Sequence, residues 1–247
     1  MSDKVELTGM VLSAVPIGEY DKRIVLLTRE RGKISGFAKG ARRQNSPLLA
    51  AAKPFSFGTF ECFEGRSSYN IYQASISNYF EELSTEFESA YYGMYFLELA
   101  DYYTRENSDE REMLKLLYVS LRALEKKRPD RRLVRRIFEL KAMTISGEYP
   151  ECFCCTGCGC AGELAGFSFE KNGMLCRQCM YEFHGEKLLE STIYAMQYII
   201  SSPVEKLYTF TVSEEVLLEL ERIMTRLCRT FIDKKFKTLE IIETLQI

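Results

Sequence analysis

The sequence predicts an α+β protein with an N-terminal β-barrel, a mainly α-helical C-terminal domain and a cysteine-rich insert among the helices. Three observations predict this class. Short apolar runs bounded by turn residues fill residues 1–80. From Leu83 on, apolar residues recur with a helical period of 3.6. Residues 151–183 show neither period and hold seven of the nine cysteines.

The first 80 residues are expected to form a compact β-domain. Each apolar run is rich in β-branched, aliphatic or aromatic residues and is followed by a Gly or Pro turn or by a polar break. The expected strands cover residues 5–15, 23–28, 33–39, 55–64 and 69–77. Five strands in about 80 residues fit a small closed barrel, and the five-stranded Greek-key OB barrel is the leading interpretation. An SH3-like barrel has the same strand count and is the alternative.

Residues 81–247 are expected to form a helical domain with a cysteine-rich ribbon at residues 151–183. A helix begins near Leu83, and Gly147 and Ser213 are typical helix-ending and helix-starting residues. The expected helices cover residues 83–97, 113–124, 131–146, 188–200, 213–231 and 239–245.

Charge, apolar run length and cysteine count limit the classes of function that this protein can have. The chain has 247 residues and a formal net charge of -2, so bulk charge does not indicate a nucleic-acid binder. Residues 1–80 nevertheless carry 11 basic and 7 acidic side chains, and a basic module is a hint of phosphate binding. No apolar run approaches 18 residues, which excludes a transmembrane helix, and we expect a cytoplasmic protein. Nine cysteines in a reducing compartment favour metal binding over disulfides.

Two cysteine pairs carry the strongest motif. Cys155 and Cys158 form one pair with two residues between them, Cys176 and Cys179 form the other, and 17 residues separate the pairs. This spacing is typical of a four-thiolate zinc site, because each short pair can turn both sulfur atoms toward one ion. Gly159 permits the tight turn after the first pair. Four thiolates leave no open coordination position, so one structural Zn²⁺ is expected.

The ligand choice has alternatives. Cys152, Cys154 and Cys160 flank the first pair, and Cys152 and Cys155 have the same spacing as Cys155 and Cys158. Any of these three thiols could therefore replace a predicted ligand. The competing interpretation of the whole group is a set of buried free thiols, which are common in protein cores.

A basic surface is predicted on the third strand and the turn that follows it. Strand alternation places Lys33, Phe37 and Lys39 on one outward face, and the strand runs into a glycine-containing basic turn. Cations interleaved with aromatic rings are typical of single-strand binding surfaces. Tyr20 and Phe57 are further stacking candidates. The competing interpretation is a solvated charged face. The candidate nucleic-acid-binding residues are Arg23, Lys33, Phe37, Lys39, Arg42 and Arg43.

A second basic patch is predicted on the helix at residues 131–146. Four arginines lie within one sector of this helix, at positions 131, 132, 135 and 136. Glu139 is the one acid on that face, and its single charge cannot balance the four positive charges of Arg131, Arg132, Arg135 and Arg136. The remaining counter-charge is expected from the acidic residues 81–130, from DNA phosphate or from an acidic partner peptide.

No catalytic motif is present in the sequence. Phosphate-binding and dinucleotide-binding glycine loops, a nucleophile elbow and a metalloprotease helix are all missing. His184 is the one histidine, which leaves little for acid–base chemistry near neutral pH. We therefore expect a binding module and not an enzyme. A structural adaptor whose barrel binds protein instead of DNA is the alternative function.

Several segments together resemble the RecO family of bacterial recombination mediators. They are TGMVL at residues 8–12, GEYDK at 18–22, KGARR at 39–43 and the two cysteine pairs. The resemblance spans nearly the whole chain. It implies an OB domain, a helical domain with an inserted zinc ribbon, binding of single- and double-stranded DNA, and annealing of complementary strands. It also implies partners: RecR, the acidic tail of the single-strand DNA-binding protein, and RecA, which the family helps to load at gaps. Lys39, Arg42 and Arg43 match the family's basic turn.

Overall fold

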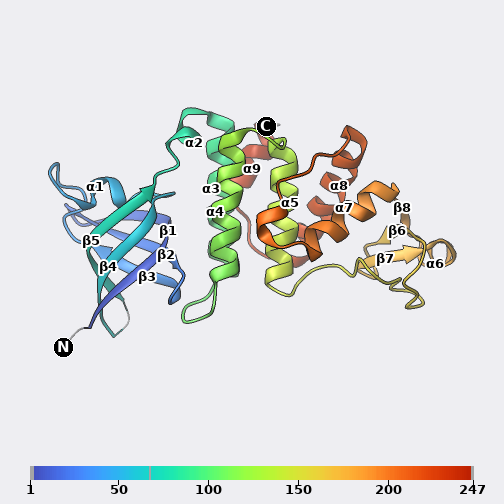
Figure 1. Ribbon diagram of the computed structural model, residues 1–247, viewed down its shortest axis with the longest axis horizontal. Coiled ribbons are helices and arrows are strands. Elements are labelled where there is room, and N and C mark those ends of the chain that lie inside the picture. The colour runs from blue at the N-terminus through green and yellow to red at the C-terminus, as the bar shows by residue number, and fades with distance from the viewer. Residues whose placement is uncertain (1–2, 67, 246–247) are drawn as a thin grey trace. The chain divides into compact units, whose positions relative to one another are not determined.

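A computed structural model describes residues 3–66 and 68–245 (Figure 1). The chain forms two compact units. One contains the residues up to Glu125 together with those from Lys235 on, and the other contains Lys126–Lys234. Within the described ranges, no helix combines the length and the apolar character needed to cross a bilayer.

The N-terminal strands form the predicted five-stranded barrel. The strands are β1 (Lys4–Ile17), β2 (Asp21–Thr28), β3 (Gly32–Ala38), β4 (Phe57–Glu64) and β5 (Tyr69–Asn78). Their order around the barrel is β1-β2-β3-β5-β4, and β4 closes the barrel by pairing with β1. All pairs are antiparallel except β3 with β5, which is parallel. This order confirms the OB-type barrel and decides against the SH3-like alternative.

The barrel core follows the alternation of the strands. In β3 every second residue is buried, so Ile34 and Ala38 point inward while Lys33, Ser35 and Phe37 do not. The interior also takes in apolar side chains from the other strands and from the β3–β4 connection. That connection contains α1 (Leu48–Ala51), a single helical turn that the sequence analysis treated as a polar break. Four residues are too few to show a helical period.

Besides α1, four helices of the described residues belong to the same unit as the barrel. They are α2 (Glu81–Thr85), α3 (Phe87–Tyr103), most of α4 (Arg111–Lys126) and α9 (Lys237–Leu245). The single helix expected from Leu83 is interrupted at Glu86, whose backbone is extended, with φ −116° and ψ 118°. Helix α3 packs against α9 and the residue just before it, where the rings of Tyr95 and Phe236 lie 5.6 Å apart.

The second unit contains a helical bundle. Its helices are α5 (Arg131–Ile145), α7 (Glu190–Ser201) and α8 (Glu214–Phe231), with a 3₁₀ turn, η1 (Val204–Lys206). Helix α5 packs against both α7 and α8. Ser213 caps α8 as predicted, because its hydroxyl accepts a hydrogen bond from the Val216 amide. Gly147 ends α5 with a positive φ of 77°, also as predicted.

The cysteine-rich insert of this unit forms a small ribbon. It consists of β6 (Leu164–Ser168), β7 (Gly173–Cys176), α6 (Arg177–Glu182) and β8 (Glu186–Lys187). The sheet order is β7-β6-β8, and β6 and β7 pair as an antiparallel hairpin. The ribbon therefore sits between helices α5 and α7 in the sequence, as predicted.

Candidate nucleic-acid interface and metal centre

One row of side chains crosses the outer face of neighbouring barrel strands. Arg23 of β2 pairs with Phe37 of β3, Phe37 pairs with Asn70 of β5, and Asn70 pairs with Phe63 of β4. Lys4 of β1 pairs with Phe63 and extends the row. Directly paired residues project from the same face of a sheet. The register thus places the predicted residues Arg23 and Phe37 side by side and adds Phe63 and Lys4, which lie too far away in sequence to be found by alternation.

The basic turn, which we define as Lys39, Arg42 and Arg43, follows β3 directly. All three side chains are exposed. Gly40 begins the turn with a positive φ of 67°, a conformation that favours glycine, and its amide donates to the Asp21 carboxylate at 2.7 Å. The backbone at this point is therefore fixed to the start of β2.

The two arginines of the basic turn are held against the β1–β2 turn. The Arg42 guanidinium donates to the backbone oxygens of Gly18 and Glu19 at 3.3 and 3.1 Å. The Arg43 guanidinium lies over the ring of Tyr20, 5.0 Å from its centroid. Tyr20, a predicted stacking residue, is thus beside the basic turn. These contacts order the arginines but leave their charge uncompensated.

Lys22 and Lys53 add to the positive potential here, although neither is among the binding residues predicted from the sequence. The Lys22 ammonium donates to the Ala52 backbone oxygen at 2.7 Å. Burial lowers the pKa of Lys22, and the positive charges of Lys53 and Arg42 lower it further. Across residues 3–66 and 68–245, no ion pair involves Arg23, Lys39, Arg42 or Arg43. The surface is consequently an uncompensated cationic cluster.

Two predicted residues of this surface are engaged elsewhere. The Lys33 ammonium donates to the Asp101 backbone oxygen at 2.6 Å and lies 3.1 Å from the Asp101 carboxylate. Its charge is therefore balanced by α3, which the strand pattern could not reveal. Phe57, a predicted stacking residue, packs against Tyr118 of α4 with ring centroids 4.7 Å apart. Neither side chain belongs to the cationic cluster.

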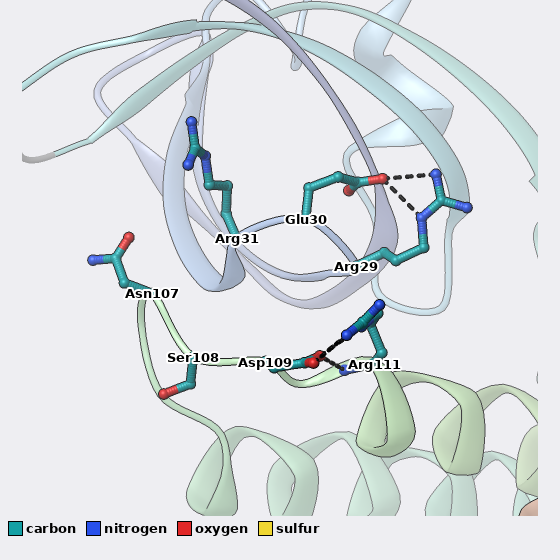
Figure 2. Close-up of a pocket in the computed structure, with 7 residues that line it drawn as sticks. All are labelled: Arg29, Glu30, Arg31, Asn107, Ser108, Asp109 and Arg111. Carbon is teal, nitrogen blue, oxygen red and sulfur yellow. Dashed lines mark hydrogen bonds and ion pairs between the residues drawn. The ribbon is translucent and has the colours of Figure 1, made fainter.

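A second basic pocket of the same unit has its charges neutralised (Figure 2). It has a volume of about 610 Å³ and lies between the β2–β3 turn and the residues before α4. Arg29 pairs with Glu30 at 2.9 Å, and Arg111 pairs with Asp109. The hydrogen bond from Arg111 lowers the pKa of the Asp109 carboxyl to about 2. The pocket's third arginine, Arg31, reaches Glu64 at 3.5 Å. Because each guanidinium is paired with a carboxylate, this pocket should attract a phosphate more weakly than the basic turn does.

The arginine helix α5 does not have the exposed cationic face that the helical wheel predicted. Arg132 donates to Glu221 through two nitrogens at 2.9 and 2.8 Å and to Glu214 at 2.9 Å. Both acids belong to α8, not to residues 81–130, which corrects the expected source of counter-charge. Arg131 is half-buried.

The other two arginines of this helix are buried. Arg135 and Arg136 are only 6% and 5% exposed and donate to the Glu139 carboxylate at 2.8 and 2.9 Å. Burial alone would raise the pKa of Glu139, but the two guanidinium charges outweigh it and hold the pKa below its usual value. The triad is therefore buried within the bundle and is not accessible to DNA.

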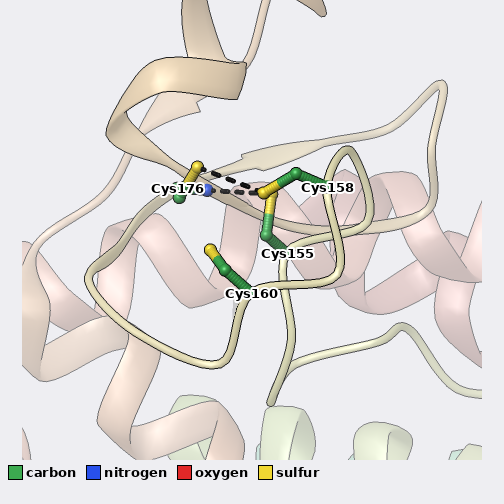
Figure 3. A group of neighbouring side chains, drawn as sticks. All are labelled: Cys155, Cys158, Cys160 and Cys176. Carbon is green, nitrogen blue, oxygen red and sulfur yellow. Dashed lines mark hydrogen bonds between the residues drawn. The ribbon is translucent and has the colours of Figure 1, made fainter.

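The ribbon gathers the predicted metal ligands (Figure 3). The sulfur atoms of Cys155, Cys158, Cys160 and Cys176 lie within 4.8 Å of one another. Cys179 is buried beside them: burial, and then hydrogen bonds to the thiols of Cys155, Cys158 and Cys176, raise its pKa. The group of sulfurs thus contains three of the four predicted ligands, Cys155, Cys158 and Cys176, and takes in Cys160, one of the alternatives, while Cys179 lies outside it.

The geometry of this thiol cluster suits a tetrahedral ion. Zn–S bonds of about 2.3 Å place the sulfurs of a tetrahedron about 3.8 Å apart. The Cys158 and Cys176 sulfurs are 3.8 Å apart. The Cys176 amide donates to the Cys155 sulfur at 3.3 Å, and Gly159 turns the chain back with a positive φ of 76°. The residues present therefore fit a four-thiolate metal centre with a structural role.

Cys152 and Cys154, the other two alternatives, lie outside this group of sulfurs. Cys152 is buried, and its backbone oxygen accepts a hydrogen bond from the Gln197 side chain at 2.8 Å. Burial raises the pKa of the Cys152 thiol, and the negative charge of Glu151 raises it further. The Cys152 thiol is accounted for by the packing of the ribbon.

Two family models together cover almost the whole chain. Residues 1–80 match the model described as recombination protein O N terminal, and residues 84–240 match the one described as recombination protein O C terminal. The boundary between the matches falls where the barrel gives way to α2.

Curated relatives agree with these matches. The DNA repair protein RecO of Acetivibrio thermocellus is 30% identical over 243 residues, which cover 98% of this chain and 97% of that protein. The protein of the same description from Alkaliphilus metalliredigens is 30% identical over 240 residues, covering 96% and 98%. That from Clostridium kluyveri is 28% identical over 243 residues, covering 96% and 92%. With the barrel, the helices and the cysteine ribbon all in place, the chain belongs to the RecO family of DNA repair proteins.

Proposed function

We propose that this chain is a DNA-binding recombination mediator. It binds single- and double-stranded DNA through the outer face of its barrel, anneals complementary single strands and assists RecA loading in gap and double-strand-break repair. The observation that supports this most directly is the uncompensated cationic cluster at the basic turn, beside outward-facing aromatic rings. Cations screen the repulsion between phosphates, which annealing requires, while the bases stay free to pair.

Salt dependence is the test of this interface. Fluorescence anisotropy with a labelled single-stranded oligonucleotide, repeated at several salt concentrations, should give a steep loss of affinity with salt. The double substitution Arg42→Ala and Arg43→Ala should reduce the slope of log K against log salt by about 1.4, since each lost contact to single-stranded DNA removes about 0.7.

The chain offers a matched control for this variant. Arg29→Ala with Arg111→Ala removes the same charge from the same unit, but both guanidinium groups are paired with neighbouring acids. This control should leave the slope unchanged. An affinity that does not depend on salt, or no DNA binding at all, would favour the structural adaptor, whose barrel binds a protein.

The proposed partners follow from the family to which the chain belongs. They are RecR, the acidic tail of the single-strand DNA-binding protein, and RecA on DNA that this chain has prepared. Annealing is measured directly by fluorescence energy transfer between labelled complementary strands coated with single-strand DNA-binding protein. The reaction needs no bond-making group, so we propose that the chain is not an enzyme.

We propose Zn²⁺ as the metal of the thiol cluster, with Cys155, Cys158, Cys176 and Cys179 as its ligands. Thiolate sulfur is the donor that zinc prefers in structural sites, and the two short cysteine pairs suit it. The ion would hold the ribbon, whose small sheet has a limited apolar core. Metal analysis of protein purified without added metal should find one zinc per chain.

A further inference from the structure

A groove on the barrel surface connects the basic turn with two aromatic rings. Its volume is about 460 Å³, within the range of sites that hold small molecules. Phe63 of β4 and Tyr72 of β5 form one wall, with ring centroids 4.7 Å apart. Residues before and within α1 form another part of the lining. The lining residues are Lys39, Ser46, Pro47, Leu48, Phe63, Asn70, Ile71 and Tyr72.

Positive charge borders the groove at two places. Lys39 lines the groove and belongs to the basic turn. The Lys4 ammonium lies 5.7 Å from the centroid of the Phe63 ring and 5.6 Å from that of Tyr72. A ligand that places an aromatic ring against Phe63 and Tyr72 therefore has two cations near it, Lys39 in the lining and Lys4 beside the two rings. A nucleotide has this combination, a flat ring joined to phosphate.

The polar groups of the groove are few and have broad specificity. The Asn70 side chain can both donate and accept hydrogen bonds, so it can meet the edge of any base. The Tyr72 hydroxyl donates to the Glu61 carboxylate at 2.8 Å, which fixes the orientation of its ring. Stacking depends only on the face of a base, and every base has one.

We propose that this groove holds one unpaired nucleobase of bound single-stranded DNA, stacked on the Phe63 and Tyr72 rings with its flanking phosphates on Lys39 and Lys4. The inference rests on the proposed DNA-binding function and gives it a base-dependent part. A base in a duplex is stacked and paired, and extracting it costs a few kcal/mol. The groove therefore favours binding of single strands over duplexes, while the basic turn binds the phosphates of both.

An abasic oligonucleotide separates base stacking from phosphate binding. Two labelled single strands of equal length and charge are compared by anisotropy with the unmodified full-length protein, one of deoxythymidines and one with every base replaced by an abasic tetrahydrofuran unit. Stacking of one base is worth about 5- to 150-fold in affinity. We expect the abasic strand to bind at least fivefold more weakly, with the same salt slope.

Substitutions assign the effect to the groove. Phe63→Leu with Tyr72→Leu keeps apolar side chains at both positions and removes both rings. This variant should lose the difference between the two strands and bind both like the abasic strand. Tyr79→Leu removes a ring that is 39% exposed and does not line the groove, so it should keep the difference. Thermal unfolding of each variant shows that the barrel remains folded.

A fluorescent base reports the stacking itself. The chain contains no tryptophan, so 2-aminopurine in the oligonucleotide can be excited without protein emission. Its fluorescence should change on binding to the wild-type protein and to Tyr79→Leu, but not to the double variant. Equal affinity for the normal and abasic strands would overturn the base pocket and leave the proposed function intact. No binding of either strand would overturn the proposed function as well.

Discussion

The Lys33 ammonium lies 3.1 Å from the Asp101 carboxylate and donates a 2.6 Å hydrogen bond to the backbone oxygen of the same residue. Lys33 and Lys39 are six residues apart, and the alternation predicted from the sequence places both on the same outward face. In the structure one is 23% exposed and ion-paired with a helix, and the other is exposed beside a groove. The two lysines are therefore expected to differ in function.

Replacing each lysine by methionine should separate stability from DNA binding. Lys39→Met should weaken binding of single-stranded DNA and reduce the salt slope, because a phosphate contact is lost. Lys33→Met should leave the affinity within about twofold and lower the free energy of unfolding by about 1.5–3 kcal/mol, since it loses a charged hydrogen bond. Anisotropy and urea unfolding measure the two effects. A loss of affinity in Lys33→Met as large as in Lys39→Met would contradict this assignment.

Four sulfurs form the thiol cluster, the Cys179 thiol lies beside them, and a tetrahedral ion takes four of these five thiols. Cys179 is buried while Cys160 is exposed, so an uncoordinated Cys160 is the easier to accommodate. We expect Cys179→Ser to lose bound zinc and Cys160→Ser to retain one ion per chain. Cys152→Ser, which alters a buried thiol outside the group of sulfurs, is the control. Zinc retained by Cys179→Ser but lost from Cys160→Ser would exchange the two roles.

Removing the acid of the buried triad of α5 should destabilise the bundle strongly. Glu139→Gln leaves Arg135 and Arg136 buried without their carboxylate, and breaking a buried pair in this way costs about 3–5 kcal/mol. The control is Glu163→Gln, whose 3.9 Å pair with Arg177 is exposed, and we expect it to leave the free energy of unfolding nearly unchanged. Urea unfolding at neutral pH measures both variants.

The same triad makes stability depend on pH in the acid range. Because the pKa of Glu139 is lowered in the folded state, its ionised form adds stability above the unfolded value of about 4.3. That contribution is lost as the pH falls below 4.3 and through the folded pKa. Glu139→Gln should therefore show a shallower loss of stability below pH 4.3 than the wild-type protein. Equal slopes in urea titrations across this range would speak against the triad as the source.

Gly32 joins the barrel to the segment after α3 through a backbone approach. Its φ is +65°, and an added Cβ would lie 2.6 Å from the Ser108 oxygen and 2.7 Å from the Arg105 oxygen. Gly147 has a similar φ of +77° with nothing within 4 Å. Gly147→Ala should cost about 1–2 kcal/mol from backbone strain alone. Gly32→Ala should cost more, because the backbone must also move, and thermal unfolding compares the two.

Local sequence patterns predicted most of the strands and helices. Apolar runs bounded by turn residues located all five barrel strands, and the 3.6-residue period located the long helices. The break at Glu86 in the helix expected from Leu83 was not predicted. The apolar stripe continues across this short extended link without a change of period, so the sequence pattern does not reveal it. Helix α1 was missed for the opposite reason, since one turn is shorter than the period that reveals a helix.

By itself the sequence determined the strands, the long helices, the cysteine pairs and the basic turn, since each is a pattern among residues that lie near one another along the chain. Only the tertiary structure decided which cations remain uncompensated and which rings face them. Asp101 is 68 residues from Lys33, Glu221 is 89 from Arg132, and Phe63 meets Asn70 and Lys4 only through the register of three strands. Charge is balanced, and rings are brought together, by distance in space, and that distance exists only once the chain has folded.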